Sequence, residues 1–352
     1  MHNAGYVTGY IGKWHLGSNR GRLSDGRVTE RNERRPVPPH RRGGYRDVWL
    51  AADALEHTSS AYGGHVFDEN GNQIELEGYR VDALTDLAID RIAALPHNRP
   101  FFMWISFLEP HHQNDRLRVI GPRGQATAFR DFDVPGDLLR WRGDWRWNYA
   151  EYLAACANID ANLGRLVEAL DQRGELDNTV IIYTSDHGSH FRTRNLEYKR
   201  SCHDASLRIP LAAAGPGFAP SERRSELVSV LDLFPTVAAA ADVSSGVALD
   251  GEALQTPIDR DDLLVQISES QIGRALRTER FTLGARARLG HPLNGHRKAA
   301  PSDTSSRTCM TTSRTHTNRP IWSTARCTGR SEPNSQHAFA SASPRSKAPH
   351  PK

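Results

Sequence analysis

Residues 5–17 read Gly-Tyr-Val-Thr-Gly-Tyr-Ile-Gly-Lys-Trp-His-Leu-Gly, and this stretch does most to decide the fold. Its four glycines allow the backbone to bend closely around a ligand, because glycine adopts conformations that other residues avoid. Lys13 and His15 are two positions apart, so they point to the same side where the chain is extended. A cation and a titratable imidazole on one side suit an oxyanion ligand. The alternative is a glycine-rich turn with a solvated lysine and a packed histidine.

The composition of the 352 residues indicates a globular protein. Hydrophobic residues make up 38% and charged residues 24%, and no apolar run approaches the roughly 18 residues that a membrane span requires. Integral membrane and fibrous proteins are therefore excluded. The four cysteines show no CxxC spacing, so neither a zinc module nor a disulfide scaffold is indicated.

The order of apolar segments predicts a doubly wound α/β fold. Residues 101–107 and 179–184 are apolar on both faces, which is typical of interior strands in a mainly parallel sheet with helices on both faces. Residues 207–214 contain a proline and are expected near a sheet edge. Apolar residues recur at helical spacing over 81–95 and 149–170, so we expect two helices against the sheet.

The last 52 residues differ from the rest of the chain. Residues 301–352 contain 18 Ser or Thr, one Ile, and no Leu or Val, so they predict disorder. Residues 291–352 carry a formal charge of +8, which leaves −4 for residues 1–290. A basic tail could make the chain a non-catalytic anion- or nucleic-acid-binding protein. The tail lacks aromatic interleaving and long basic runs, so we expect no nucleic-acid partner.

Several polar residues directly follow predicted strands, where open α/β sheets place their ligands. Asp186 and His187 are plausible metal ligands, although an Asp-His-Gly sequence also suits an ordinary turn. His111 and His112 could contact a substrate or bond to loop carbonyl groups. Lys199, taken alone, reads as a solvated lysine.

The order and spacing of these residues resemble the sulfatases of the alkaline phosphatase superfamily. Residues 5–17 are similar to the family signature GYxTGxxGKWHLG, and the resemblance covers about residues 4–290. The other matching segments follow in the family's order: Pro110-His111, Thr184-Ser185-Asp186-His187-Gly188, Lys199 with a later Arg-Ile-Pro-Leu run, Gly215-Pro216-Gly217, and residues 230–236.

The resemblance implies that four residues handle the sulfate group. Lys13 matches the lysine that contacts both the nucleophile and a sulfate oxygen, and His15 the histidine that helps the sulfated intermediate to collapse. His111 and Lys199 match the pair that holds the sulfate and assists departure of the alcohol. His112 could take this role in place of His111. The alternative is that His112 is a solvent-facing loop histidine.

The resemblance also implies a divalent cation, usually Ca²⁺ in this family, with Asp186 and His187 as its second pair of ligands. Cations neutralise charge on the transferred group. The family's nucleophile is a formylglycine made from the first residue of a C/S-x-P-x-R motif, upstream of the GKWHLG string. None of the four cysteines is followed by x-Pro-x-Arg, so the nucleophile and half the metal shell are expected to be absent from this chain. Exposed sheet edges then predict poor solubility or partial folding.

Residues 305–323 resemble a family segment translated in the wrong frame. Regrouping their codons permits L-E-D-P-Y-E-Q-T-N-L-V, which is similar to the LYDLxxDPxExxNL segment near the C-terminus of many sulfatases. We therefore expect a frameshift or sequencing error just before residue 305. The alternative is a genuine basic tail, and resequencing the gene would decide between them.

Three parts are expected along the chain: a sulfatase-like α/β core over residues 1–255, the start of a C-terminal subdomain over 256–300, and a disordered, out-of-frame tail over 301–352. The expected function is hydrolysis of a small-molecule or glycan sulfate ester, with no membrane partner and with little activity in a chain that lacks its nucleophile. A phosphonate or phosphate ester is the alternative substrate within the same superfamily.

Overall fold

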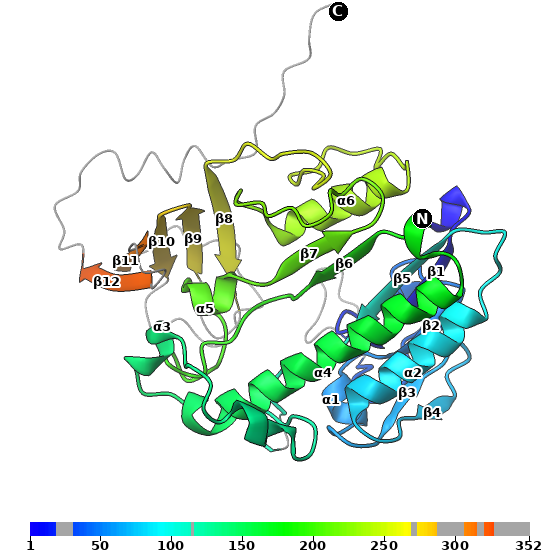
Figure 1. Cartoon of the computed structure of the whole chain (residues 1–352), viewed down its shortest axis with the longest axis horizontal. Helices are drawn as coiled ribbons and strands as arrows, with labels where there is room; N and C mark the ends of the chain where they lie inside the picture. The colour runs from blue at the N-terminus through cyan, green and yellow to red at the C-terminus, as the bar shows by residue number, and fades with distance from the viewer. Residues whose placement is uncertain (19–30, 114–115, 269–272, 287–305, 315–319, 327–352) are drawn as a thin grey trace, which may run out of the picture. The chain divides into compact units, whose positions relative to one another are not determined.

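The computed structural model describes residues 1–18, 31–113, 116–268, 273–286, 306–314 and 320–326 (Figure 1). These residues form two compact units. Unit 1 comprises Met1–Asp133 and Trp145–Val180, and unit 2 comprises Val134–Asp144 and Ile181–Lys352. The domain boundary expected near residue 255 stays a prediction.

Unit 1 contains a mixed sheet of five strands in the order β4-β3-β2-β1-β5. The strand β1 is parallel to both of its neighbours, whereas β2, β3 and β4 pair in antiparallel fashion. The strands are β1 (Val7–Lys13), β2 (Val48–Ala52), β3 (His65–Phe67), β4 (Gln73–Glu75) and β5 (Phe101–Ser106). The helices are α1 (Leu55–Thr58), α2 (Arg80–Ala93) and α4 (Trp145–Gln172), with 3₁₀ turns at His2–Ala4, Pro39–Arg41, Gln125–Phe129 and Leu176–Asn178. The α/β class and the parallel centre of the sheet are confirmed.

Two glycines allow β1 to lie at the centre of this sheet. A Cβ atom at Gly9 would fall 2.4 Å from the Sδ atom of Met103 on β5. At Gly12 it would fall 2.0 Å from the carbonyl oxygen of Ser106, and φ at Gly12 is +104°. Only glycine fits that conformation and that spacing. The glycines of this segment were expected to form a bend around a ligand, but the segment forms a strand.

One face of β1 packs against an aromatic cluster, because successive side chains of a strand point to opposite faces. Tyr10 lies in a cluster with Val37, Trp49 and Ala51, and Trp14 and Tyr45 pack against it. The rings of Tyr10 and Trp14 meet edge to face, with their centroids 4.8 Å apart. This cluster ties the segment around residues 37–45 to one face of the sheet.

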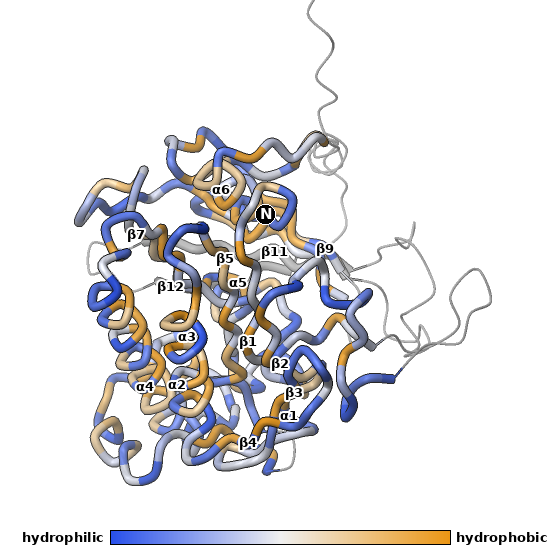
Figure 2. The backbone as a smooth tube through the Cα atoms, turned by 90° about the vertical axis from the view of Figure 1, so that its right-hand side faces the viewer, coloured by the Kyte–Doolittle hydropathy of each residue, from blue (hydrophilic) through white to orange (hydrophobic). Residues whose placement is uncertain are grey.

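The helices α2 and α4 run side by side, and both contain alternating hydrophobic and hydrophilic residues (Figures 1 and 2). Both confirm the helical periodicity of the sequence. Asn158 and Asn162 of α4 donate to the Oδ1 atom of Asp82 on α2, at 2.9 and 2.7 Å.

Gly174 ends α4 with a φ of +73°, as expected of a C-cap glycine. Within the described residues, no helix has the length and apolar character needed to cross a membrane.

Unit 2 contains two antiparallel sheets. The first pairs β6 (Ile181–Thr184) with β7 (Leu211–Ala214). The second has the order β12-β11-β10-β9-β8. Its strands are β8 (Asp262–Ile267), β9 (Gly273–Thr278), β10 (Phe281–Arg286), β11 (Ser306–Arg314) and β12 (Pro320–Arg326). The helices are α3 (Gly136–Leu139), α5 (Asp204–Leu207) and α6 (Leu233–Ala240), with a 3₁₀ turn at Val230–Asp232.

One expectation differs from the structure of unit 2. Residues 179–184 were expected inside a parallel sheet, but β6 pairs with β7 in antiparallel fashion and its residues are half-buried. An unbroken apolar run does not encode the direction of its partner. Within residues 301–352, β11 and β12 extend the ladder from β10, and the disorder expected over this tail stays a prediction. Thr and Ser can pair through the backbone without an apolar core. The rest of the tail lies outside the described residues.

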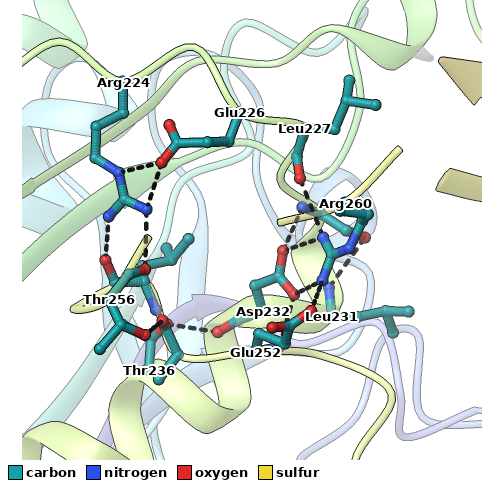
Figure 3. Close-up of polar contacts among 12 residues, drawn as sticks. Arg224, Glu226, Leu227, Leu231, Asp232, Thr236, Glu252, Thr256 and Arg260 are labelled. Carbon is teal, nitrogen blue, oxygen red and sulfur yellow. Dashed lines mark hydrogen bonds and ion pairs between the residues drawn. The ribbon is translucent and has the colours of Figure 1, made fainter. Parts of the chain in front are cut away.

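A buried ion pair anchors α6 (Figure 3). Arg260 donates from its two terminal nitrogens to the two carboxylate oxygens of Asp232, each at 2.8 Å. The backbone amides of Ser229 and Glu252 donate to the same carboxylate, at 2.7 and 2.9 Å. Burial alone would raise the pKa of Asp232, but Arg260 and these amides lower it below its usual value. The resulting network joins the start of α6 to the segment around residue 252.

We expect Gly12→Ala to lower the free energy of unfolding by about 2–4 kcal/mol, since overpacking and strained backbone each cost on the order of 1–3 kcal/mol. Urea unfolding would measure the loss. Gly164→Ala in α4 is the matched control, because nothing lies within 4 Å of its Cβ position. It should be neutral or raise stability by up to about 1 kcal/mol. Equal effects at the two positions would contradict the role of Gly12.

Candidate active site

Lys13 ends β1 beside a buried carboxylate. Its Nζ atom lies 3.3 Å from Oε1 of Glu56, and the two side chains are 14% and 7% exposed. Glu56 lies in α1, which begins three residues after β2. The hydroxyl of Tyr10 donates to the backbone carbonyl of Lys13 and fixes the end of the strand. Since β1 and β2 are parallel, their carboxyl ends bring these residues to one edge of the sheet.

Glu56 is ionised although it is buried. Burial alone would raise the pKa of its carboxyl, but the charges of Lys13 and His111 and two hydrogen bonds outweigh burial and lower the pKa below its usual value. Lys13, Glu56 and His111 therefore form an electrostatic cluster within unit 1. Glu56 was not among the predicted site residues, although it follows the short apolar run that forms β2.

His15 does not continue the extended chain from Lys13. Its φ is +57°, its side chain is exposed, and its amide donates to the carbonyl of Asp53 at 2.7 Å. The carboxylate of Asp53 is fully buried and accepts from the Gly17 amide at 2.6 Å. The same-side arrangement that an extended chain would give is thus wrong, because Asp53 turns the backbone after β1.

His111 and His112 follow β5 and differ in burial. His111 is half-buried, and its Nδ1 atom lies 2.7 Å from the carbonyl oxygen of His112. If Nδ1 carries the proton of that contact, Nε2 is the ring atom that gains or loses one. His112 is only 6% exposed, so the alternative of a solvent-facing histidine is wrong. The flanking Glu109 and Gln113 are also buried and hold the loop inward.

Unit 2 brings His187 and Lys199 into contact. The Nζ atom of Lys199 lies 3.0 Å from Nε2 of His187, whose Nδ1 lies 2.9 Å from the carbonyl oxygen of Gly188. A carboxylate oxygen of Asp186 lies 3.4 Å from the same Nε2 atom, although the Asp186 side chain is 83% exposed. The idea of Lys199 as a solvated residue is therefore wrong. Convergence of all six predicted residues on one substrate stays a prediction.

The buried His190 lies against the backbone of Lys199, and the half-buried His203 follows four residues later. The Nε2 atom of His190 lies 3.1 Å from the Lys199 carbonyl oxygen, and burial lowers the pKa of His190. Burial, with Arg194 and His190 nearby, lowers the pKa of His203 to about 3. Both rings are therefore neutral near pH 7, and the Lys199 carbonyl oxygen meets the uncharged imidazole of His190.

The donor set in unit 2 fits part of a metal shell. The Nδ1 atom of His187 contacts a carbonyl, as in most metal-ligating histidines, and Nε2, which a metal would take, lies 3.0 Å from Nζ of Lys199. Asp186 adds an exposed carboxylate. Across the ranges that the structure describes, no group of three or more His, Cys, Asp or Glu side chains is arranged to hold a metal ion. Asp186 and His187 would thus supply only two ligands.

Comparison with known proteins identifies the family. The family model described as Sulfatase matches residues 1–243. The chain belongs to the sulfatase family. It is 31% identical over 216 residues to the N-acetylglucosamine-6-sulfatase of Capra hircus, with 54% of the chain and 38% of that protein aligned. The chain thus spans well under half the length of this curated sulfatase.

Solved structures share the sulfatase fold. The structure of yidJ from Bacteroides fragilis, assigned as a sulfatase, matches with a TM-score of 0.64 and 23% identity, over 81% of the chain and 66% of that protein. A second structure, of a protein in complex with its substrate D-glucosamine-2-N,6-O-disulfate, matches with a TM-score of 0.59 and 22% identity, over 81% and 71%. Sulfatases generally use a divalent metal and a formylglycine.

We expect Lys13→Met to raise the pKa of Glu56, because burial would then face less opposing charge. Carboxyl ¹³C NMR titration would measure it. Lys13→Arg keeps the cation and should keep the pKa low. A Glu56 carboxyl that titrates at the same pH in the native chain and in Lys13→Met would contradict the pairing.

We expect His203 to make the fold sensitive to acid. Its pKa is about 3 in the folded protein and about 6.5 when unfolded, so protons bind the unfolded chain preferentially between these values. Stability should therefore fall as pH drops through this window, by up to about 1.4 kcal/mol per pH unit. Urea midpoints between about pH 6 and pH 4 should depend less on pH in His203→Gln. His57→Gln, at an exposed histidine, is the control and should behave as the native chain does.

Proposed function

We propose that the chain carries the sulfate-holding part of a sulfuric ester hydrolase. The observation that carries the proposal is the cluster of Lys13, Glu56 and His111 at the carboxyl edge of β1. Lys13 and His111 occupy the positions that match the sulfatase residues in contact with sulfate. Their charges lie next to a buried carboxylate, which holds them in place before an anion arrives.

The residues would act at different stages of the reaction and on two kinds of ester oxygen. Lys13 would stabilise negative charge on a non-bridging sulfate oxygen, because an ammonium group in a partly desolvated site interacts strongly with an anion. His111 would stabilise or protonate the bridging oxygen as the alcohol departs. Lys199 matches the other member of the family's pair for this step. His15 would accept a proton when the sulfated intermediate breaks down.

Asp186 and His187 would hold a divalent cation, which when bound would neutralise charge on the sulfate group. Ca²⁺ is proposed, as in the family, although it prefers oxygen ligands and His187 offers nitrogen. The nucleophile of the family is a formylglycine, and none of the four cysteines lies in the motif that yields one. We therefore propose that this chain binds sulfate esters without turning them over.

A sulfated glycan is the proposed substrate class. The support is the name of the Capra hircus relative, N-acetylglucosamine-6-sulfatase, and the glucosamine disulfate bound in the second structure. The substrate in that name and the bound disulfate are both amino sugars that carry sulfate. We place N-acetylglucosamine 6-sulfate first among candidate ligands for the same reason.

Binding of inorganic sulfate and of N-acetylglucosamine 6-sulfate, measured by calorimetry in the presence of Ca²⁺, tests the proposal. Lys13→Ala and Lys199→Ala should each weaken binding about tenfold or more, because a charge-assisted hydrogen bond contributes about 1.5–3 kcal/mol. A chromogenic aryl sulfate should bind and stay intact.

Lys347→Ala is the control, since it removes the same charge from the basic tail. Sulfate affinity that depends on Lys347 and is insensitive to Lys13 would overturn the proposal in favour of anion binding by the tail. Tighter binding of a phosphonate monoester than of the matched sulfate ester would favour the phosphonate alternative. Measurable turnover of the aryl sulfate would contradict the expected inactivity.

A further inference from the structure

Arg80 is a fully buried cation at the start of α2, and it bonds to two other segments of unit 1. Its Nη2 atom donates to Glu109 at 2.6 Å and to Gln113 at 3.0 Å. Its Nη1 atom donates to the hydroxyl of Ser59 at 3.0 Å and to the Ser59 carbonyl at 3.3 Å. One guanidinium group therefore joins α2, the end of α1 and the loop after β5.

The first branch of this network holds the loop that carries His111. Glu109 and Gln113 lie on either side of His111, and both are buried against Arg80. The loop has further backbone bonds, from His111 to Leu108 at 3.0 Å and between Gln113 and Arg118 at 2.9 Å. Because both flanking side chains are fixed by Arg80, the loop holds the His111 ring in a defined position.

The second branch leads to Lys13. Ser59 directly follows α1, and both its amide and its hydroxyl donate to the carbonyl of Leu55, at 2.9 and 2.7 Å. Glu56 is the next residue after Leu55, and its carboxylate pairs with Lys13. Arg80 thus fixes the short helix that presents the partner of Lys13.

Only arginine suits this position. Its planar guanidinium offers five donors in a fixed fork, which can reach a carboxylate, an amide oxygen and a hydroxyl at once. Glu109 balances its charge in a place where both side chains are at most 1% exposed. A lysine would keep the charge but would lose the simultaneous reach to Ser59 and Gln113.

We propose that Arg80 is a positioning residue, which sets the spacing between Lys13 and His111 for the sulfate group. The proposal rests on the proposed function of this cluster. Arg80 does not touch the reacting atoms. It acts through Glu109 and Gln113 on one side and through Ser59 and α1 on the other.

Arg80→Lys tests the proposal in the full chain. We expect the ¹⁵N signals of the His111 ring and the carboxyl ¹³C signal of Glu56 to shift, and the affinity for inorganic sulfate to fall at least threefold. Far-ultraviolet circular dichroism should remain native. Arg165→Lys is the matched control, because it alters a partly exposed pair between α4 and Asp86 of α2. It should change none of these readouts.

Two further substitutions test the two branches separately. They also test the proposal if Arg80→Lys does not fold. Ser59→Ala should move the Glu56 signal and leave His111 unchanged, and Gln113→Met should do the opposite. Native signals for both groups in all three variants would overturn the proposal, even where stability falls. If the native chain binds no sulfate, the proposed function fails, whereas the two NMR signals still report whether Arg80 positions the groups.

Discussion

The close approach of β1 to β5 is the constraint on which the rest of unit 1 depends. Gly9 and Gly12 leave no room for a side chain between the strands, and β1 pairs in parallel with both of its neighbours. Parallel strands end at the same edge, so the residue after each strand meets its counterparts there. Lys13, α1 and the His111 loop come together for this reason, although more than 90 residues of sequence separate the first from the last.

Carboxylates determine how the cations at this edge are held. Lys13 faces Glu56 and Arg80 faces Glu109, and all four side chains are largely withdrawn from water. Fixed charges of this kind need little rearrangement when an anion binds, which is the condition for electrostatic stabilisation of a transition state. The polar network is therefore part of the site and continues beneath the residues that would meet the ligand.

The sequence predicted the elements whose signal is local. The helices α2 and α4 repeat apolar residues at helical spacing, and β5 is a continuous apolar run, so all three were found. The candidate residues were located through a long family motif, and the structure describes where each lies. Other features depend on contacts that are distant in the chain. The strand β1 was hidden by its glycines, β6 does not encode the direction of β7, and Glu56 and Arg80 become meaningful only beside Lys13 and Glu109.

The pair of Asp232 and Arg260 closes a loop of the backbone in unit 2. Its two side chains hold the start of α6 and residue 260 together, while Val247 and Leu249 between them are exposed. Because the entropic cost of closing a loop grows only slowly with its length, insertions near residue 247 would change the stability of this closure little. This stretch can thus accept added length while α6 keeps its anchor.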